Sequence, residues 1–120
     1  MEAKIKLTKT MLDKSIIDAN KSVREFLIYA TLGTYDELDA GDKVSVPSVY
    51  EDNTPTTVTF YRAKGRGDKR ISIKNLRKFA EEGDTVKLRS EVVMIEDCIF
   101  DVRVIVYKED DDQQGETVAA

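Results

Sequence analysis

Apolar and polar residues alternate with a period of two along much of this chain, which is the pattern of strands with one buried face. The first alternating run covers residues 4–9. A later run over residues 56–63 is rich in β-branched and aromatic side chains, which favour strands. Similar runs predict five more strands, at residues 15–17, 43–46, 70–73, 85–93 and 99–107. The pattern therefore predicts a mainly β chain with about seven strands.

Two short helices are expected between these strands. Ser22 and Glu25 form a capping box, in which the serine hydroxyl accepts from the amide three residues on and the glutamate reaches back. The first helix should end at Gly33, because glycine adopts the left-handed conformation easily. A second helix is predicted over residues 75–82 and should end at Gly83. The residues expected to face inward are Val23, Phe26, Leu27, Ala30, Leu76, Phe79 and Ala80.

The chain contains one pattern twice. Phe26 and Phe79 occupy similar places in the two predicted helices, 53 positions apart, and the strand-like run over residues 5–11 has a counterpart at the same offset. Each half ends in a Gly-Asp pair that leads into a strand, at Gly41-Asp42 and at Gly83-Asp84. Two such ββαβ-like halves tend to close into one small barrel with pseudo-two-fold symmetry, so the repeat is a strong indication of fold.

Length and composition fit a single barrel domain. A chain of 120 residues, 41% of them apolar, is about one domain with a modest core. We expect residues 1–107 to form the barrel. Residues 108–120 carry five acids and one lysine with no apolar pattern, so we expect a disordered acidic tail. No apolar run of about 18 residues occurs, and we expect no membrane contact.

Few side chains in this sequence are suited to catalysis or metal binding. The chain has no histidine and one cysteine, Cys98, which we expect to be a buried apolar residue. One cysteine excludes an internal disulfide and fits a reducing, cytoplasmic location. Without histidine, the sequence lacks the usual Ser-His and Cys-His nucleophile pairs and the common zinc ligands. We therefore expect no enzymatic activity, no metal and no cofactor.

The formal net charge of −4 hides an uneven distribution. Residues 62–78 contain eight basic residues and one acid, and residues 1–24 contain six basic residues and three acids. Residues 25–61 and 79–107 are net acidic. A concentrated basic stretch in a net-acidic chain indicates an anionic partner, for which nucleic acid is the first candidate.

The second half resembles known barrel proteins. Residues 70–88 are similar to the strand–helix–Gly-Asp–strand unit of swapped-hairpin regulators of the AbrB type, with Lys74 where that family usually has a proline. The doubled unit with a seventh strand, over residues 4–107, looks more like the DNA-binding pseudobarrel. That fold occurs in plant auxin-response-type transcription factors and in the effector domain of EcoRII-type restriction endonucleases. The resemblance implies a seven-stranded pseudobarrel, with a double-psi or cradle-loop barrel as the alternative.

The pseudobarrel family holds double-stranded DNA in the major groove with two arms, and the resemblance implies a non-enzymatic DNA-binding protein here. A domain of this size suits a repressor, a phage or plasmid factor, or a restriction-related target-recognition module that lacks its nuclease. The first arm would follow the first strand and contain Lys6, Thr8, Lys9, Thr10 and Lys14. The second arm would be the hairpin between the fourth and fifth strands and contain Arg62, Lys64, Arg66, Lys69 and Arg70.

The charge count points to the same hairpin, residues 61–70, without reference to any family. Its glycines let the backbone approach a phosphate, and arginine can pair with phosphate or guanine. Arg62 and Lys64 should share one strand face, with Tyr61 on the other. The alternative is a solvated turn whose lysines protect a sheet edge. Likewise, Lys74, Arg77 and Lys78 are either phosphate contacts, with Lys74 as the first choice, or an exposed helix face balanced by Glu81 and Glu82.

Acidic residues give the remaining alternatives. Because Asp42 and Asp84 both follow a glycine, we expect them to tie turns rather than to act in acid–base or metal chemistry. The second functional hypothesis is a protein-interaction or inhibitor module that occupies a basic cleft of a nucleic-acid enzyme. Its acidic segments would be residues 35–42, 81–84 and 109–112.

Overall fold

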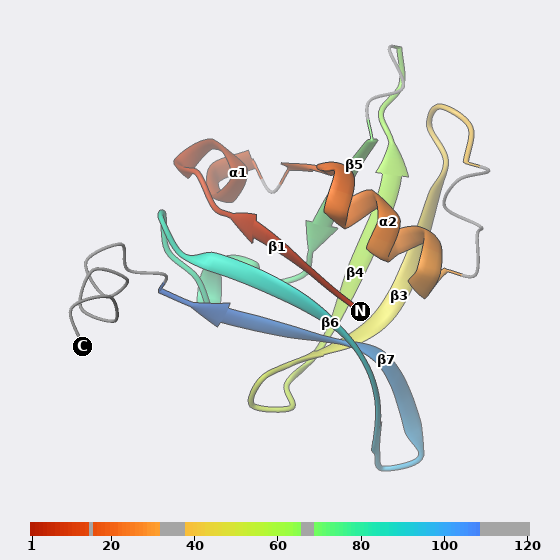
Figure 1. The fold of residues 1–120 in the computed structure, drawn as a ribbon, viewed down its shortest axis with the longest axis vertical. Helices are drawn as coiled ribbons and strands as arrows, with labels where there is room; N and C mark the ends of the chain where they lie inside the picture. The colour runs from red at the N-terminus through yellow and green to blue at the C-terminus, as the bar shows by residue number, and fades with distance from the viewer. Residues whose placement is uncertain (15, 32–37, 66–68, 109–120) are drawn as a thin grey trace.

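The computed structural model describes residues 1–14, 16–31, 38–65 and 69–108. Within these ranges the chain forms one curled seven-stranded sheet, two short α-helices and the 3-10 turn η2 (Leu76–Lys78) (Figure 1). The predicted mainly β fold is confirmed, and the curled sheet is consistent with a pseudobarrel. The remaining elements are β1 (Glu2–Lys6), α1 (Lys9–Lys14), β2 (Ile17–Asp18), α2 (Lys21–Ala30), β3 (Lys43–Tyr50), β4 (Pro55–Arg62), β5 (Lys69–Ile73), β6 (Thr85–Ile95) and β7 (Cys98–Tyr107).

The sheet curls into a half-barrel, so that its two edges approach each other. Its strand order is β1-β6-β7-β3-β4-β5-β2, which makes β1 and β2 the edge strands although only α1 separates them in the chain. Neighbouring strands are antiparallel, apart from the parallel pair β3 and β7. The side-chain amide of Asn20, which follows β2, donates to the carbonyl of Lys4 in β1 at 3.4 Å. This contact joins the two edges.

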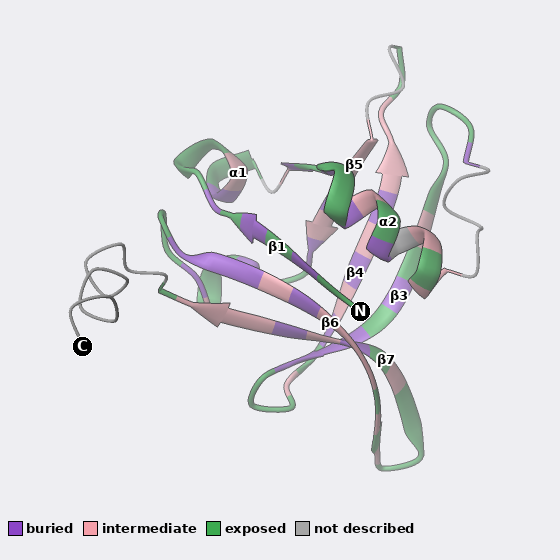
Figure 2. Ribbon diagram, in the orientation of Figure 1, coloured by how far each residue is buried: buried purple, intermediate pink, exposed green. Residues whose placement is uncertain are grey.

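The core lies inside the curl and contains the apolar positions of the period-two pattern (Figure 2). Val58 and Phe60 of β4 and Ile71 of β5 are fully buried. Helix α2 adds Val23 and Phe26 to the same cluster, and both are almost completely shielded from solvent. Burying these side chains supplies most of the stabilisation, at about 1.5–3 kcal/mol for each.

The two Gly-Asp turns have matching side-chain hydrogen bonds. Oδ2 of Asp42 accepts from the backbone amide of Asp39 at 3.3 Å, and Oδ2 of Asp84 accepts from the amide of Glu81 at 2.9 Å. In both cases the donor lies three residues before the aspartate. The expected role of these aspartates in tying their turns is therefore confirmed.

The backbone of each Gly-Asp turn also binds a strand of the other half. Gly41 donates to the carbonyl of Arg62 at 2.7 Å, and Gly83 donates to the carbonyl of Leu7 at 3.0 Å. Both glycines have a φ near 90°, which favours glycine. Arg62 and Leu7 each return a hydrogen bond to the aspartate carbonyl of the turn. Leu7 and Arg62 therefore occupy equivalent places in the two halves. They are 55 positions apart, whereas the sequence pattern predicted an offset of 53.

Several predicted elements have different boundaries in the structure. The strand predicted at residues 43–46 continues through Pro47 to Tyr50. The strand over residues 5–11 is wrong beyond Lys6, because Thr8 begins helix α1 through its hydroxyl and carbonyl oxygens. The capping box at Ser22 is also wrong, since Asn20 accepts from the amides of Val23 and Arg24 and begins α2 two residues earlier. The predicted helix over 75–82 shortens to the single turn η2.

Two predictions about single residues also fail or fall outside the described ranges. Cys98 is exposed rather than buried, because it stands at the start of β7 in the outer part of the β6–β7 hairpin. Gly33, the expected end of the first helix, lies outside the described residues. So does the predicted acidic tail, apart from Lys108.

Candidate nucleic-acid interface

The β4–β5 hairpin, the predicted second arm, places its cations on both faces. Arg62 pairs with Lys69 and Tyr61 pairs with Arg70, and paired residues share a face. Arg62 and Lys69 therefore lie on one face, and Tyr61 lies on the other as predicted. Lys64 follows two residues after Arg62 and is exposed. Arg66 lies outside the described residues.

Arg62 supports the structure of the hairpin base. Its Nη1 donates to the carbonyl of Leu38 at 2.7 Å, which ties the segment before β3 to the end of β4. The aliphatic stem of Lys64 lies close to Gly41, since a Cβ atom added to Gly41 would lie 3.5 Å from Cγ of Lys64. Arg62 is consequently half-buried, whereas Lys64 extends its ammonium into solvent.

Arg70 and Lys69 are joined to the edge strand β2. Nε of Arg70 lies 3.5 Å from a carboxylate oxygen of Asp18, and the arginine side chain is 27% exposed. The carbonyl of Lys69 accepts from the amide of Ala19 at 3.0 Å. Asp18 therefore compensates part of the positive charge on the outer face of this hairpin.

The first arm is a short helix rather than an extension of β1. Oγ1 of Thr8 accepts from the amide of Met11 at 3.2 Å, so Thr8 serves as the N-cap of α1. Leu12 fixes the helix to the core, while Lys9 and Lys14 are exposed. Two further residues of this arm, Lys6 and Thr10, are exposed as well.

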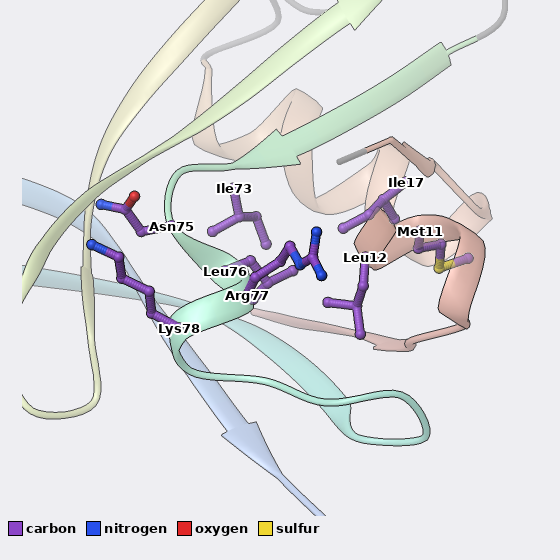
Figure 3. A pocket seen from close by; sticks show the side chains of 8 residues that line it. All are labelled: Met11, Leu12, Ile17, Ile73, Asn75, Leu76, Arg77 and Lys78. Carbon is purple, nitrogen blue, oxygen red and sulfur yellow. The ribbon is translucent and has the colours of Figure 1, made fainter. Parts of the chain in front are cut away.

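Helix α1 lies beside η2, and a cavity of about 270 Å³ separates the two (Figure 3). Leu12 and Leu76 lie on its two sides, and Arg77 and Lys78 also line it. Nη2 of Arg77 lies 3.9 Å from a carboxylate oxygen of Asp13 in α1. Arg77 thus pairs with an aspartate of α1, whereas the sequence predicted that glutamates near its own helix would balance its charge. The two cations of η2 therefore lie next to the first arm.

Lys74 lies at the far end of β5 from the hairpin turn, so the structure does not group it with Lys69. Its backbone carbonyl accepts from the hydroxyls of Tyr50 at 2.7 Å and Thr56 at 2.8 Å, while its side chain is exposed. The ring of Tyr50 stacks on Phe79 with centroids 3.8 Å apart. Burial raises the pKa of Tyr50 to about 12.

The predicted cations that the structure describes, apart from Lys6 of β1, thus fall into two groups, one at each end of β5. The hairpin group contains Arg62, Lys64, Lys69 and Arg70. The helix group contains Lys9 and Lys14 of α1 together with Arg77 and Lys78 of η2, and Lys74 lies just before η2. Arg77 and Lys78 were not among the first predicted DNA contacts. The sequence shows only a local helix face at these positions and does not show that α1 folds back onto η2.

The predicted acidic segment 81–84 is largely occupied within the fold. Nζ of Lys108 lies 3.0 Å from Asp84 and 3.3 Å from Glu81. Burial raises the pKa of Asp84, but its hydrogen bond from the Glu81 amide and the ammonium of Lys108 outweigh burial, and the pKa is lowered. This segment therefore offers less negative charge to a partner than its composition indicates.

Comparisons with family models, with curated proteins and with solved structures found no match to this chain. Within the described ranges, no group of three or more His, Cys, Asp or Glu side chains is arranged to hold a metal ion. The helices of the described residues are all too short or too polar to cross a membrane.

Proposed function

We propose that this chain is a non-enzymatic cytoplasmic protein that binds double-stranded DNA through the β4–β5 hairpin and the first arm. The observation that carries the proposal is the common face of Arg62 and Lys69 on a projecting hairpin, with the exposed Lys64 two residues beyond Arg62 (Figure 1). Lysines and arginines on such a face attract phosphates and release counterions, which gives affinity that depends on salt.

The helix group supplies a second contact at a suitable distance. Between the two groups lies β5, whose five residues span about 16 Å at the usual rise of a strand. The major groove of DNA is about 12 Å wide, so the two groups can reach phosphates on its two sides. Lys9 and Lys14 on one side and Lys64 and Lys69 on the other are the proposed phosphate contacts. Arg62 supports the hairpin and contributes charge.

The test measures binding of the full chain to a random-sequence duplex by fluorescence anisotropy over a series of salt concentrations. Each lost phosphate contact reduces the slope of log K against log salt by about 1, so Lys64→Gln should lower the slope by about that amount. Lys4→Gln is the matched control, since Lys4 is an exposed lysine of β1 that belongs to neither of the two groups. It should leave the slope unchanged.

Two outcomes would count against DNA binding. Absence of binding at low salt would exclude the electrostatic contact that the proposal requires. Equal effects of Lys64→Gln and Lys4→Gln would mean that the duplex has no preferred face. The acidic protein-interaction module would then be the next hypothesis, although the pairing of Glu81 and Asp84 with Lys108 gives it little support. A chain shortened to residues 1–107 should bind DNA more tightly if the acidic tail competes for the basic groups.

A further inference from the structure

The cavity between α1 and η2 has apolar walls at the edge of the core. These walls come from α1, from the edge strand β2, from the end of β5 and from η2 (Figure 3). Four buried side chains of the core line it: Leu12, Ile17, Ile73 and Leu76. Apolar walls hold water poorly, because a bound water needs about two to four polar partners. The walls therefore suit an apolar molecule better than they suit solvent.

The rim of the same cavity is basic. Arg77 and Lys78 line it, and none of the described residues that line it is acidic. Figure 3 shows the guanidinium of Arg77 directed toward α1, whereas Lys78 and Asn75 point away from α1. The side chain of Arg77 is 66% exposed although it lines the cavity, so its guanidinium lies where the cavity meets solvent. An apolar molecule in the cavity can consequently place a negative charge beside Arg77.

Asp13 of α1 leaves the guanidinium of Arg77 available. The distance between Nη2 of Arg77 and Oδ1 of Asp13 is 3.9 Å, longer than the roughly 2.7–2.9 Å of a charge-assisted hydrogen bond. Within the described ranges this contact is the one ion pair of Arg77, and its guanidinium donates no hydrogen bond there. A guanidinium presents a planar fork of N–H donors that matches the two oxygens of a carboxylate. Arg77 can therefore bind a carboxylate more closely than it binds Asp13.

The volume of the cavity limits the size of its ligand. At about 30 Å³ for each heavy atom, the share of a water molecule in the liquid, 270 Å³ holds about nine heavy atoms. Ligand pockets in proteins usually measure about 300–1,000 Å³, so this cavity is at the lower end of that range. A straight chain of about eight carbons fits, whereas a nucleotide or a peptide segment is too large.

We propose that the cavity between α1 and η2 binds a small monocarboxylate with an apolar body, of the size of a medium-chain fatty acid. Its chain lies among the four core side chains, and its carboxylate accepts hydrogen bonds from the guanidinium of Arg77. Such a ligand contacts both α1 and η2. The proposal does not depend on DNA binding, because the cavity is not lined by any of the proposed phosphate contacts, Lys9, Lys14, Lys64 and Lys69.

The test measures binding of octanoate to the full chain by isothermal titration calorimetry, with octanamide as a neutral molecule of similar shape. Octanoate should bind with a Kd below about 1 mM, and octanamide should bind at least about tenfold more weakly, because it lacks the charge that pairs with Arg77. Arg77→Gln should weaken octanoate at least about tenfold and remove the difference between the two ligands. Arg24→Gln is the matched control. It removes the same charge from α2, which contributes no residue to the cavity, and it should leave both Kd values unchanged.

Two further variants test the wall and the rim separately. Leu12→Phe should weaken both ligands, because the larger side chain occupies part of the cavity. Asp13→Asn should tighten octanoate by about two- to fivefold, because it removes the carboxylate that competes for Arg77. The same change should leave octanamide unaffected. Far-UV circular dichroism shows whether each variant is folded, and Arg77→Gln and Asp13→Asn change exposed side chains and do not depend on repacking the core.

Several results would overturn the proposal. One is the absence of octanoate binding up to about 5 mM, well above the expected Kd. Another is octanamide binding as tightly as octanoate, which would mean that the rim does not select an anion. Equal weakening by Arg24→Gln and Arg77→Gln would reduce the effect to overall charge. Unchanged binding to a folded Leu12→Phe chain would place the ligand outside the cavity.

Discussion

Asp84 provides a direct test of how much a Gly-Asp turn stabilises this fold, because Asp42 makes the equivalent bond in a different environment. Asp84 is buried, accepts from the Glu81 amide at 2.9 Å and lies 3.0 Å from Nζ of Lys108. Asp42 is exposed, and its bond to the Asp39 amide is 3.3 Å long. The two aspartates therefore share a geometry but differ in burial.

The expected magnitudes follow from that difference. A hydrogen bond to a charged, buried group contributes about 1.5–3 kcal/mol, and an exposed ion pair adds at most about 1 kcal/mol. Asp84→Ala should lower the free energy of unfolding by about 2–3 kcal/mol, and Asp42→Ala should lower it by about 1 kcal/mol or less. Lys108→Ala should lower it less than Asp84→Ala does, because the lysine side chain is 73% exposed and its ion pair is screened by solvent.

Urea denaturation measures these differences as shifts of the midpoint at constant slope. Its pH dependence provides an independent check. The pKa of Asp84 is lowered in the folded state, so the carboxylate stabilises the fold above the unfolded pKa of about 3.9, and this contribution is lost as the pH falls through the folded pKa. The difference in stability between the parent chain and Asp84→Ala should accordingly shrink below about pH 4. Equal costs for Asp42→Ala and Asp84→Ala would refute the argument from burial.

Two further predictions concern Arg62 at the end of β4 and Tyr50 at the end of β3. Arg62→Ala should lower the free energy of unfolding by about 1–2 kcal/mol through its lost bond to the Leu38 carbonyl, whereas Lys64→Ala should change it by less than about 0.5 kcal/mol in the same urea titration. The raised pKa of Tyr50, about 12, means that the folded state retains a proton that the unfolded chain releases near pH 10. Stability should therefore fall by up to about 2 kcal/mol between pH 10 and 12 in thermal melts, and a Tyr50→Phe chain should lack this fall.

The fold could be predicted from the sequence where the rules that govern it are local or repeated. The period-two pattern locates the strands because each inward residue, such as Val58 or Phe60, has an outward neighbour. The Gly-Asp pairs locate the turns because glycine reaches φ near 90° and aspartate bonds an amide three residues back. Helix α1 was missed because the alternating pattern up to Lys9 resembles a strand, while Thr8 and the burial of Leu12 favour a helix.

The candidate site was less predictable because its geometry depends on distant contacts. Charge counting located the basic hairpin, but it could not show that the guanidinium of Arg62 binds Leu38, 24 positions earlier. It also could not show that Arg77 lies beside Asp13 of α1, since nothing local indicates that α1 folds against η2. The exposure of Cys98 has the same origin, because it depends on where β1 and β3 end beside the β6–β7 hairpin.

The pairing of β1 with β6 has a consequence for how this protein is made. Glu2 of β1 pairs with Arg89 of β6, so β1 has no partner until β6 has been synthesised. Pairings so distant in sequence form slowly, because a long loop must close first. The β4–β5 and β6–β7 hairpins should therefore form earlier, while Ala3 and Ile5 remain uncovered. In the cell, this nascent chain should be a chaperone client until β6 has emerged.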